Sequence, residues 1–184
     1  MTSSLVGSEM CIRDRCNTWV FLLTAIIDSL YPVILQSFDN KKLFERKNKQ
    51  LYAIVFYVSV GVSLLFSLLA SPIVSILYGD AYAPAAAPLR IITWYTAFSY
   101  LGVARNAWVV SYSKQNYLKY LYIGAAITNV LLNALMIPLW GASGAALASL
   151  LTQISTILLF PALIKDLQPN VKLMIDAILL KDVF

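Results

Sequence analysis

One arginine, Arg105, lies inside a long apolar stretch of the sequence, where a charge needs compensation. On membrane-insertion scales, a charge near the middle of a span costs about 2.5–3.5 kcal/mol. Trp108 and Tyr112 follow on the same side of a helix, and Asn106 is adjacent. Guanidinium groups pair with phosphate oxygens through two parallel hydrogen bonds, and flat aromatic rings suit sugar faces. These four residues are therefore a candidate binding site for a phosphate that carries a sugar.

Asp28 is the only acidic residue inside an apolar run. Thr24, Pro32 and Gln36 recur with it every fourth residue, which puts a polar stripe on one helix face. Three interpretations are open. Arg105 and Asp28 face a water-filled transport cavity, in which Asp28 binds a proton or a cation; the two form a structural ion pair; or Arg105 extends to the membrane interface.

The composition excludes several classes of site. The sequence has no histidine, and its two cysteines, Cys11 and Cys16, lie close together near the start. Zinc sites, Ser-His-Asp triads and Cys-His pairs cannot be built from such a chain, so we expect no enzyme, no metal and no cofactor. A coupling ion, H⁺ or Na⁺, stays open.

The same composition indicates a lipid bilayer as the surroundings. Hydrophobic residues make up 60% of the chain and charged residues only 12%, against about a quarter in ordinary soluble domains. The net charge of +5 comes from short basic clusters between apolar runs, which is typical of cytoplasmic loops. Nucleic acid is therefore not an expected partner.

Five apolar runs have lengths near the roughly 20 residues that cross about 30 Å of hydrocarbon. They span residues 18–38, 51–78, 91–112, 117–139 and 141–164. The sequence thus predicts an all-α membrane protein, with about five transmembrane helices in a bundle over residues 16–168. The second run is longer than a straight crossing requires, so we expect it to tilt or to emerge at one end.

Basic residues predict the orientation of these spans. The densest cluster, from Lys41 to Lys49, lies between the first two runs and is expected in the cytoplasm. Alternation then places Lys114 and the residues from Lys165 onward on the same side, so the C-terminus is cytoplasmic. Residues 169–184 have an amphipathic pattern too short and too charged to span. They are predicted to lie on the cytoplasmic interface or to lead to a further helix.

The stretch from Asn129 to Thr152 predicts a tight helical hairpin. Pro138 is expected to end the first helix and Gly141 to let the backbone reverse. Asn129 and Asn133 put two amides on one face, where a neighbouring helix can satisfy them. Small faces let helices approach closely in lipid. Beyond the turn, small residues recur every fourth position on two adjacent rows, which include Gly141 and Ala145, and Gly144 and Ala148.

Residues 1–15 differ from the rest of the chain. The string SLVGSEMCIRDR resembles translated sequencing-adapter DNA, so we expect this segment not to be native and the true chain to continue upstream of about Cys16. A genuine amino-terminal tail is the alternative.

Several segments, in order, resemble the second half of polysaccharide-biosynthesis flippases of the O-antigen type. They are YPVILQSF at 31–38, LYGDAYAPAAAPLRII at 77–92, Gln115 at the start of a helix, and NVLLNALMIPLWGASGAALAS at 129–149. The superfamily also contains multidrug and toxic-compound extruders and lipid II flippases. The resemblance covers residues 18–164. It implies a MATE-like transporter of two six-helix lobes, in which the five runs are helices eight to twelve and form most of one lobe.

The resemblance also implies a cargo and a place in the cell. Such proteins move an undecaprenyl-pyrophosphate-linked oligosaccharide across the cytoplasmic membrane of a bacterium or archaeon by alternating access. The missing N-terminal lobe of the same chain would be a partner, together with the lipid bilayer. Two alternatives remain: a multidrug or cation antiporter of the same superfamily, and a non-transporting membrane scaffold. Assignment of Arg105 to the cargo site rests on its chemistry and depth, since no sharp motif marks that site.

Overall fold

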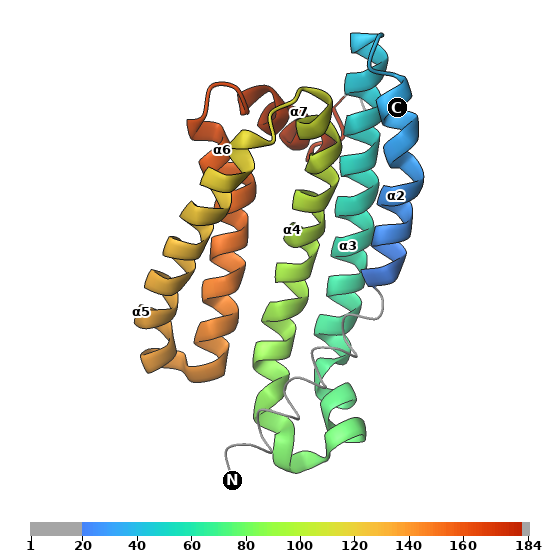
Figure 1. Ribbon diagram of the computed structural model, residues 1–184. Coiled ribbons are helices and arrows are strands. Elements are labelled where there is room, and N and C mark those ends of the chain that lie inside the picture. The colour runs from blue at the N-terminus through green and yellow to red at the C-terminus, as the bar shows by residue number, and fades with distance from the viewer. Residues whose placement is uncertain (1–19, 182–184) are drawn as a thin grey trace.

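The computed structural model describes residues 20–181, and its regular structure is entirely helical (Figure 1). The predicted all-α fold is therefore confirmed for these residues. The proposed adapter-derived segment and both cysteines lie outside them. The long helices are α2 (Val20–Gln36), α3 (Lys41–Tyr78), α4 (Ala86–Ser111) and α5 (Asn116–Ile154), and the short ones are the 3₁₀ turn η1 (Asp80–Ala85), the π-helix η2 (Ser155–Leu159), α6 (Phe160–Leu163) and α7 (Gln168–Ile178).

The helices form a bundle with two well-separated ends. The α3 and α4 helices pack against each other along their lengths and are joined through η1 at one end. The α2 helix packs on α3, and the hairpin made by α5 and its continuation lies beside α4. At the opposite end from η1, α7 lies across the bundle and packs on α3 (Figure 1). The start of α3, the end of α4, the start of α5 and α7 thus meet at one end.

The α3 helix begins earlier than the hydrophobic pattern predicts. Asn40 caps it, because its side-chain oxygen accepts a hydrogen bond from the Leu43 backbone N–H at 3.2 Å. The basic stretch from Lys41 to Lys49 is therefore helix and not loop. With 38 residues and a rise of 1.5 Å each, α3 is ~57 Å long, well beyond the ~30 Å of a bilayer core. The basic residues occupy the first turns of α3 and lengthen the helix beyond its apolar part.

The apolar face of α7 packs on the bundle. Val171, Met174 and Ala177 are buried, and the Asn170 side-chain amide donates a hydrogen bond to the Tyr52 hydroxyl at 2.7 Å. The Tyr57 hydroxyl in turn donates to the carbonyl of Ile178 at 2.8 Å. The apolar face of α7 is thus covered by the bundle, chiefly by α3. Near the end of the predicted amphipathic stretch, Leu180 is half exposed, and Phe184 lies outside the described residues.

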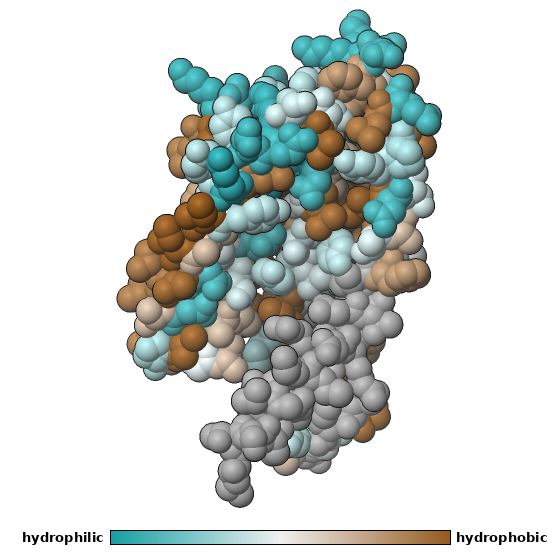
Figure 2. All heavy atoms as spheres, in the orientation of Figure 1, coloured by the Kyte–Doolittle hydropathy of each residue, from teal (hydrophilic) through white to brown (hydrophobic). Residues whose placement is uncertain are grey.

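Two helical stretches are long and apolar enough to cross a membrane, Lys41–Ile76 and Asn116–Leu163. The most apolar window of each is only 28% and 33% buried. The core helix of a soluble protein would bury most of such a window, whereas here Leu68 is 78% exposed and Leu135 is 68% exposed. Figure 2 shows hydrophobic residues gathered along α5 and hydrophilic residues at the end where α2 and α3 meet. Residues 23–36 form a shorter apolar helix.

The predicted hairpin is present, and its reversal lies at Gly141. This residue has φ 55° and ψ −130°, and it is the one non-helical position inside α5. Positive φ is strained for residues with a Cβ, so glycine suits the turn. Pro138 does not end the helix, which continues to the residue before Gly141. A proline removes one backbone donor, and here the helix tolerates that loss close to its end.

One row of small residues forms the tight contact inside the hairpin. A Cβ added to Gly144 would lie 2.2 Å from the carbonyl oxygen of Met136. Ala148 is fully buried, whereas Ala145 is half-buried and Gly141 is exposed. The Asn129 amide donates to the Thr152 hydroxyl across the hairpin at 3.4 Å and accepts from the Asn133 amide at 2.8 Å. The row that starts at Gly144 is therefore the packed one.

Replacing Gly144 with alanine should destabilise the protein, because the new methyl group would meet backbone that cannot rotate away. Overpacking of this kind costs about 1–3 kcal/mol or more. Gly61→Ala is the matched control, since Gly61 is also helical and has no neighbouring atom within 4 Å of its added Cβ. There the gain in helix propensity, about 0.5–1 kcal/mol, should dominate. Thermal unfolding in detergent measures both, and a Gly144→Ala protein as stable as the wild type would refute the close contact.

Candidate functional site

Arg105 lies inside the bundle, on the face of α4 that meets the hairpin. Its side chain is 2% exposed, and its Nη1 donates a hydrogen bond to the carbonyl oxygen of Thr156 at 3.2 Å. The same face carries Gly102, where an added Cβ would be 3.6 Å from side-chain atoms of Gln153 and Ile157. The arginine is thus enclosed by protein and joins α4 to η2.

The partner of Arg105 is a carbonyl that the helix itself leaves free. In η2 the Phe160 N–H donates to Ser155, five residues back, which is the π-helical register. The next donor in that register would be residue 161, which is proline and has no N–H. The carbonyl of Thr156 therefore lacks its helical partner, and an unsatisfied backbone group in an apolar setting is costly. The guanidinium of Arg105 supplies the missing donor.

Asp28 is not the partner of Arg105. Its side chain is exposed on α2, whereas Arg105 is buried. The ion pairs between described residues are Lys49 with Asp176 and Lys114 with Asp166. The structural Asp28–Arg105 pair considered from the sequence is therefore absent, and Arg105 instead donates to the Thr156 carbonyl.

Two buried polar atoms near this contact lack partners among the described residues: Nε of Arg105 and Oδ1 of Asn106. Most buried polar groups in proteins are hydrogen-bonded, so such atoms are exceptions. Neither residue lines the cavity described next. The structure thus separates Arg105 and Asn106 from Trp108 and Tyr112, although all four were predicted to form one site.

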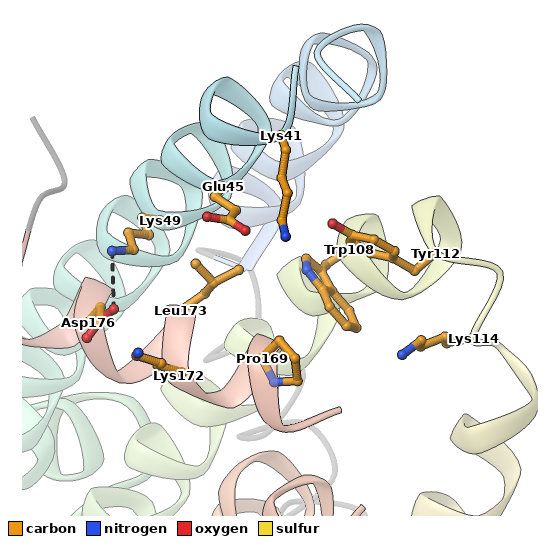
Figure 3. Close-up of a pocket in the computed structure, with 10 residues that line it drawn as sticks. All are labelled: Lys41, Glu45, Lys49, Trp108, Tyr112, Lys114, Pro169, Lys172, Leu173 and Asp176. Atoms are coloured by element: carbon orange, nitrogen blue, oxygen red, sulfur yellow. Dashed lines mark ion pairs between the residues drawn. The ribbon is translucent and has the colours of Figure 1, made fainter. Parts of the chain in front are cut away.

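Trp108 and Tyr112 border a cavity of about 440 Å³ between the start of α3, the end of α4 and α7 (Figure 3). This volume is in the range of small-molecule sites. Both aromatic residues come from the last turns of α4. The cavity lies at the end of the bundle where the basic clusters meet. Its lining residues are Lys41, Glu45, Lys49, Trp108, Tyr112, Lys114, Pro169, Lys172, Leu173 and Asp176.

The aromatic wall of the cavity is packed against its own neighbours. The rings of Trp108 and Tyr112 have centroids 4.6 Å apart, and Tyr112 makes edge contacts with Phe38 and Phe44. The Lys114 ammonium lies over the Trp108 ring at 5.6 Å from its centroid. Since Trp108 is only 3% exposed, it leaves little surface on which a sugar could stack. The aromatic rings therefore form a packed wall of the cavity, and the lysine side chains are its polar groups.

The lysines of the cavity fall into two groups. Lys49 pairs with Asp176 at 3.2 Å, and Lys114 pairs with Asp166 at 3.5 Å. Lys41 and Lys172 have no carboxylate within 4.0 Å among the described residues. Two carboxylates, those of Glu45 and Asp176, line the cavity together with four lysines. With Asp166, the partner of Lys114, counted as a third carboxylate, the cavity has an excess of one positive charge.

Asp166 fixes the edge of this region by holding two turns together. The Tyr117 hydroxyl donates to its carboxylate, and the Lys114 ammonium contacts the carboxylate and donates to the Asp166 backbone carbonyl at 2.7 Å. The hydrogen bond from Tyr117, followed by the charge of Lys114, holds the pKa of Asp166 below its usual value. The turn between α4 and α5 is thus tied to the turn before α7.

Metal coordination has no support within residues 20–181, which contain no group of three or more His, Cys, Asp or Glu side chains that could hold an ion.

Sequence reasoning missed Lys41 and Lys172 as a pair, since they are 131 positions apart and nothing local connects them. It also missed Pro161, whose position five residues after Thr156 was the available signal for a carbonyl in need of a donor.

Comparison of this chain with protein-family models, with curated proteins and with solved structures found no match.

The contact between Arg105 and Thr156 can be tested through Pro161. Arg105→Met should lower the thermal stability, because it leaves the Thr156 carbonyl without a donor. In a Pro161→Ala background, residue 161 regains an N–H that can bond this carbonyl, so the same change should cost less. We expect a coupling of about 1 kcal/mol in a double-mutant cycle measured by unfolding in detergent.

Asp28→Asn provides the control for that cycle. It should have an effect additive with that of Arg105→Met, because Asp28 is exposed and unpaired with Arg105. Strong coupling to Asp28 together with none to Pro161 would restore the ion-pair interpretation and contradict the capping role.

Proposed function

We propose that this chain is a multi-pass membrane protein that forms most of one lobe of a MATE-like flippase for a polyprenyl-pyrophosphate-linked oligosaccharide. The observation that carries the proposal is the apolar exterior. Two long helical stretches keep most of their hydrophobic windows outside the bundle core, and the basic residues gather at one end. Such a surface suits lipid along its sides and water at its ends.

The proposal includes five crossings of the membrane. In the proposed arrangement α2, α3 and α4 each cross once, and the α5 stretch crosses twice because it reverses at Gly141. The α4 helix has 26 residues, which gives ~39 Å at 1.5 Å each, enough to cross despite its buried arginine. The order of these elements agrees with the resemblance to the second half of O-antigen-type flippases.

The charge of the cavity favours an anionic cargo over a cationic one. Its lining has more lysines than carboxylates, and pyrophosphate is a strong acceptor of charge-assisted hydrogen bonds. The larger number of lysines supports the flippase over the antiporter. For a non-transporting scaffold, no feature of the described residues gives specific support.

The proposed membrane orientation has a direct test. Single cysteines at Lys42 and Ala83, both exposed, are introduced after Cys11 and Cys16 are replaced by serine. An impermeant thiol reagent added to intact cells should label the cysteine at 83 and should label the cysteine at 42 only after permeabilisation. The opposite pattern would reverse the orientation, and equal labelling of both in intact cells would contradict a membrane-spanning bundle.

The proposed cargo is tested by deleting the gene in the cell that carries it. A flippase defect should leave polyprenyl-pyrophosphate-linked oligosaccharide in the cytoplasmic leaflet and reduce polysaccharide at the surface. Restoring the gene should reverse both changes. Unaltered lipid-linked oligosaccharide combined with new sensitivity to cationic drugs would point to an antiporter and contradict the flippase.

A further inference from the structure

We infer that the cavity between α3, α4 and α7 is a binding site for a phosphate group, held between Lys41 and Lys172. The two ammonium groups come from different helices, α3 and α7, and border the same hollow (Figure 3). This site is separate from the buried Arg105, which does not line the cavity.

Two lysines are available to a ligand because the other two have partners. Lys49 is held by Asp176 and also donates to the backbone carbonyl of Lys181 at 3.4 Å. Lys114 is held by Asp166 through its side chain and backbone. Lys41 and Lys172 are exposed and have no carboxylate within 4.0 Å among residues 20–181. They can therefore turn toward an anion without breaking an existing ion pair.

The charges of the cavity favour an anion. Lys41 and Lys172 lack ion-pair partners among the described residues, and a terminal phosphate, which carries about −1.5 to −2 at neutral pH, has enough oxygens to accept hydrogen bonds from both. Glu45 also borders the cavity without an ion-pair partner, so it opposes the anion.

In the proposed membrane orientation, the end of the bundle that holds the cavity lies at the level of the cytoplasmic lipid headgroups. The phosphate can come from a lipid headgroup or from a soluble molecule, and the experiment separates the two sources.

The inference rests on the proposed function for its membrane setting but not for transport. Binding is therefore measured on the purified full chain in detergent. Native mass spectrometry counts bound phosphatidic acid, whose headgroup is a phosphate monoester, against phosphatidylcholine. In parallel, inorganic pyrophosphate is titrated and the shift in unfolding temperature is recorded.

The variant Lys41→Gln/Lys172→Gln should bind phosphatidic acid about tenfold more weakly, because two charge-assisted hydrogen bonds are lost. The control is Lys42→Gln/Lys165→Gln, which removes the same charge from exposed residues outside the cavity and should change binding little. Glu45→Gln should strengthen binding, since it removes the opposing carboxylate.

The outcomes separate cleanly. Selective binding of phosphatidic acid without a pyrophosphate effect identifies a lipid headgroup as the ligand, whereas a pyrophosphate effect without lipid binding identifies a soluble source. Both effects together show that the phosphate alone suffices. Neither effect, or an equal loss in the control pair, overturns the site. Since transport is not measured, a failed deletion phenotype would remove the flippase proposal and leave this site standing.

Discussion

The bond from Arg105 to the Thr156 carbonyl is the interaction on which the packing of this bundle depends. A backbone carbonyl in an apolar interior needs a donor, and Pro161 removes the one that the π-helical register would supply. By providing that donor from α4, Arg105 fixes the distance between α4 and the hairpin. Gly102, one turn before it, lies opposite Gln153 and Ile157 on the same face. The charge that looked like a ligand-binding group from the sequence is thus part of the framework.

Features set by neighbouring residues were predictable from the sequence. The reversal at Gly141 follows from the conformational freedom of glycine, and the close contact at Gly144 follows from the spacing of small residues. The helical character and the apolar exterior follow from composition and periodicity. Pro138 was the local exception, since its place near the end of a helix decides whether it interrupts that helix.

Features that join distant segments were not predictable in the same way. The sequence pattern marks α7 as amphipathic but does not say whether lipid or α3 covers its apolar side. It places Trp108 and Arg105 on one helical face, but the neighbours of that face differ from turn to turn. Arg105 meets the hairpin, whereas Trp108 meets the lysine cavity. One-dimensional spacing cannot resolve such a change of surroundings along a single helix.

The hydrogen bond between Asn170 and Tyr52 also fixes an order of assembly, because it can form only after α7 has been synthesised. Tyr52 is fully buried in the finished bundle, yet its partner lies 118 residues later in the chain. At a synthesis rate of about 5–20 residues per second, the ribosome needs ~6–24 s to deliver that partner. During this interval α7 does not yet pack on the part of α3 around Tyr52, and the aromatic residues there are accessible to other proteins. Among the described helices, α7 thus emerges after α3, α4 and α5 and then packs on α3, and the interval is a window in which an insertion factor can hold α3.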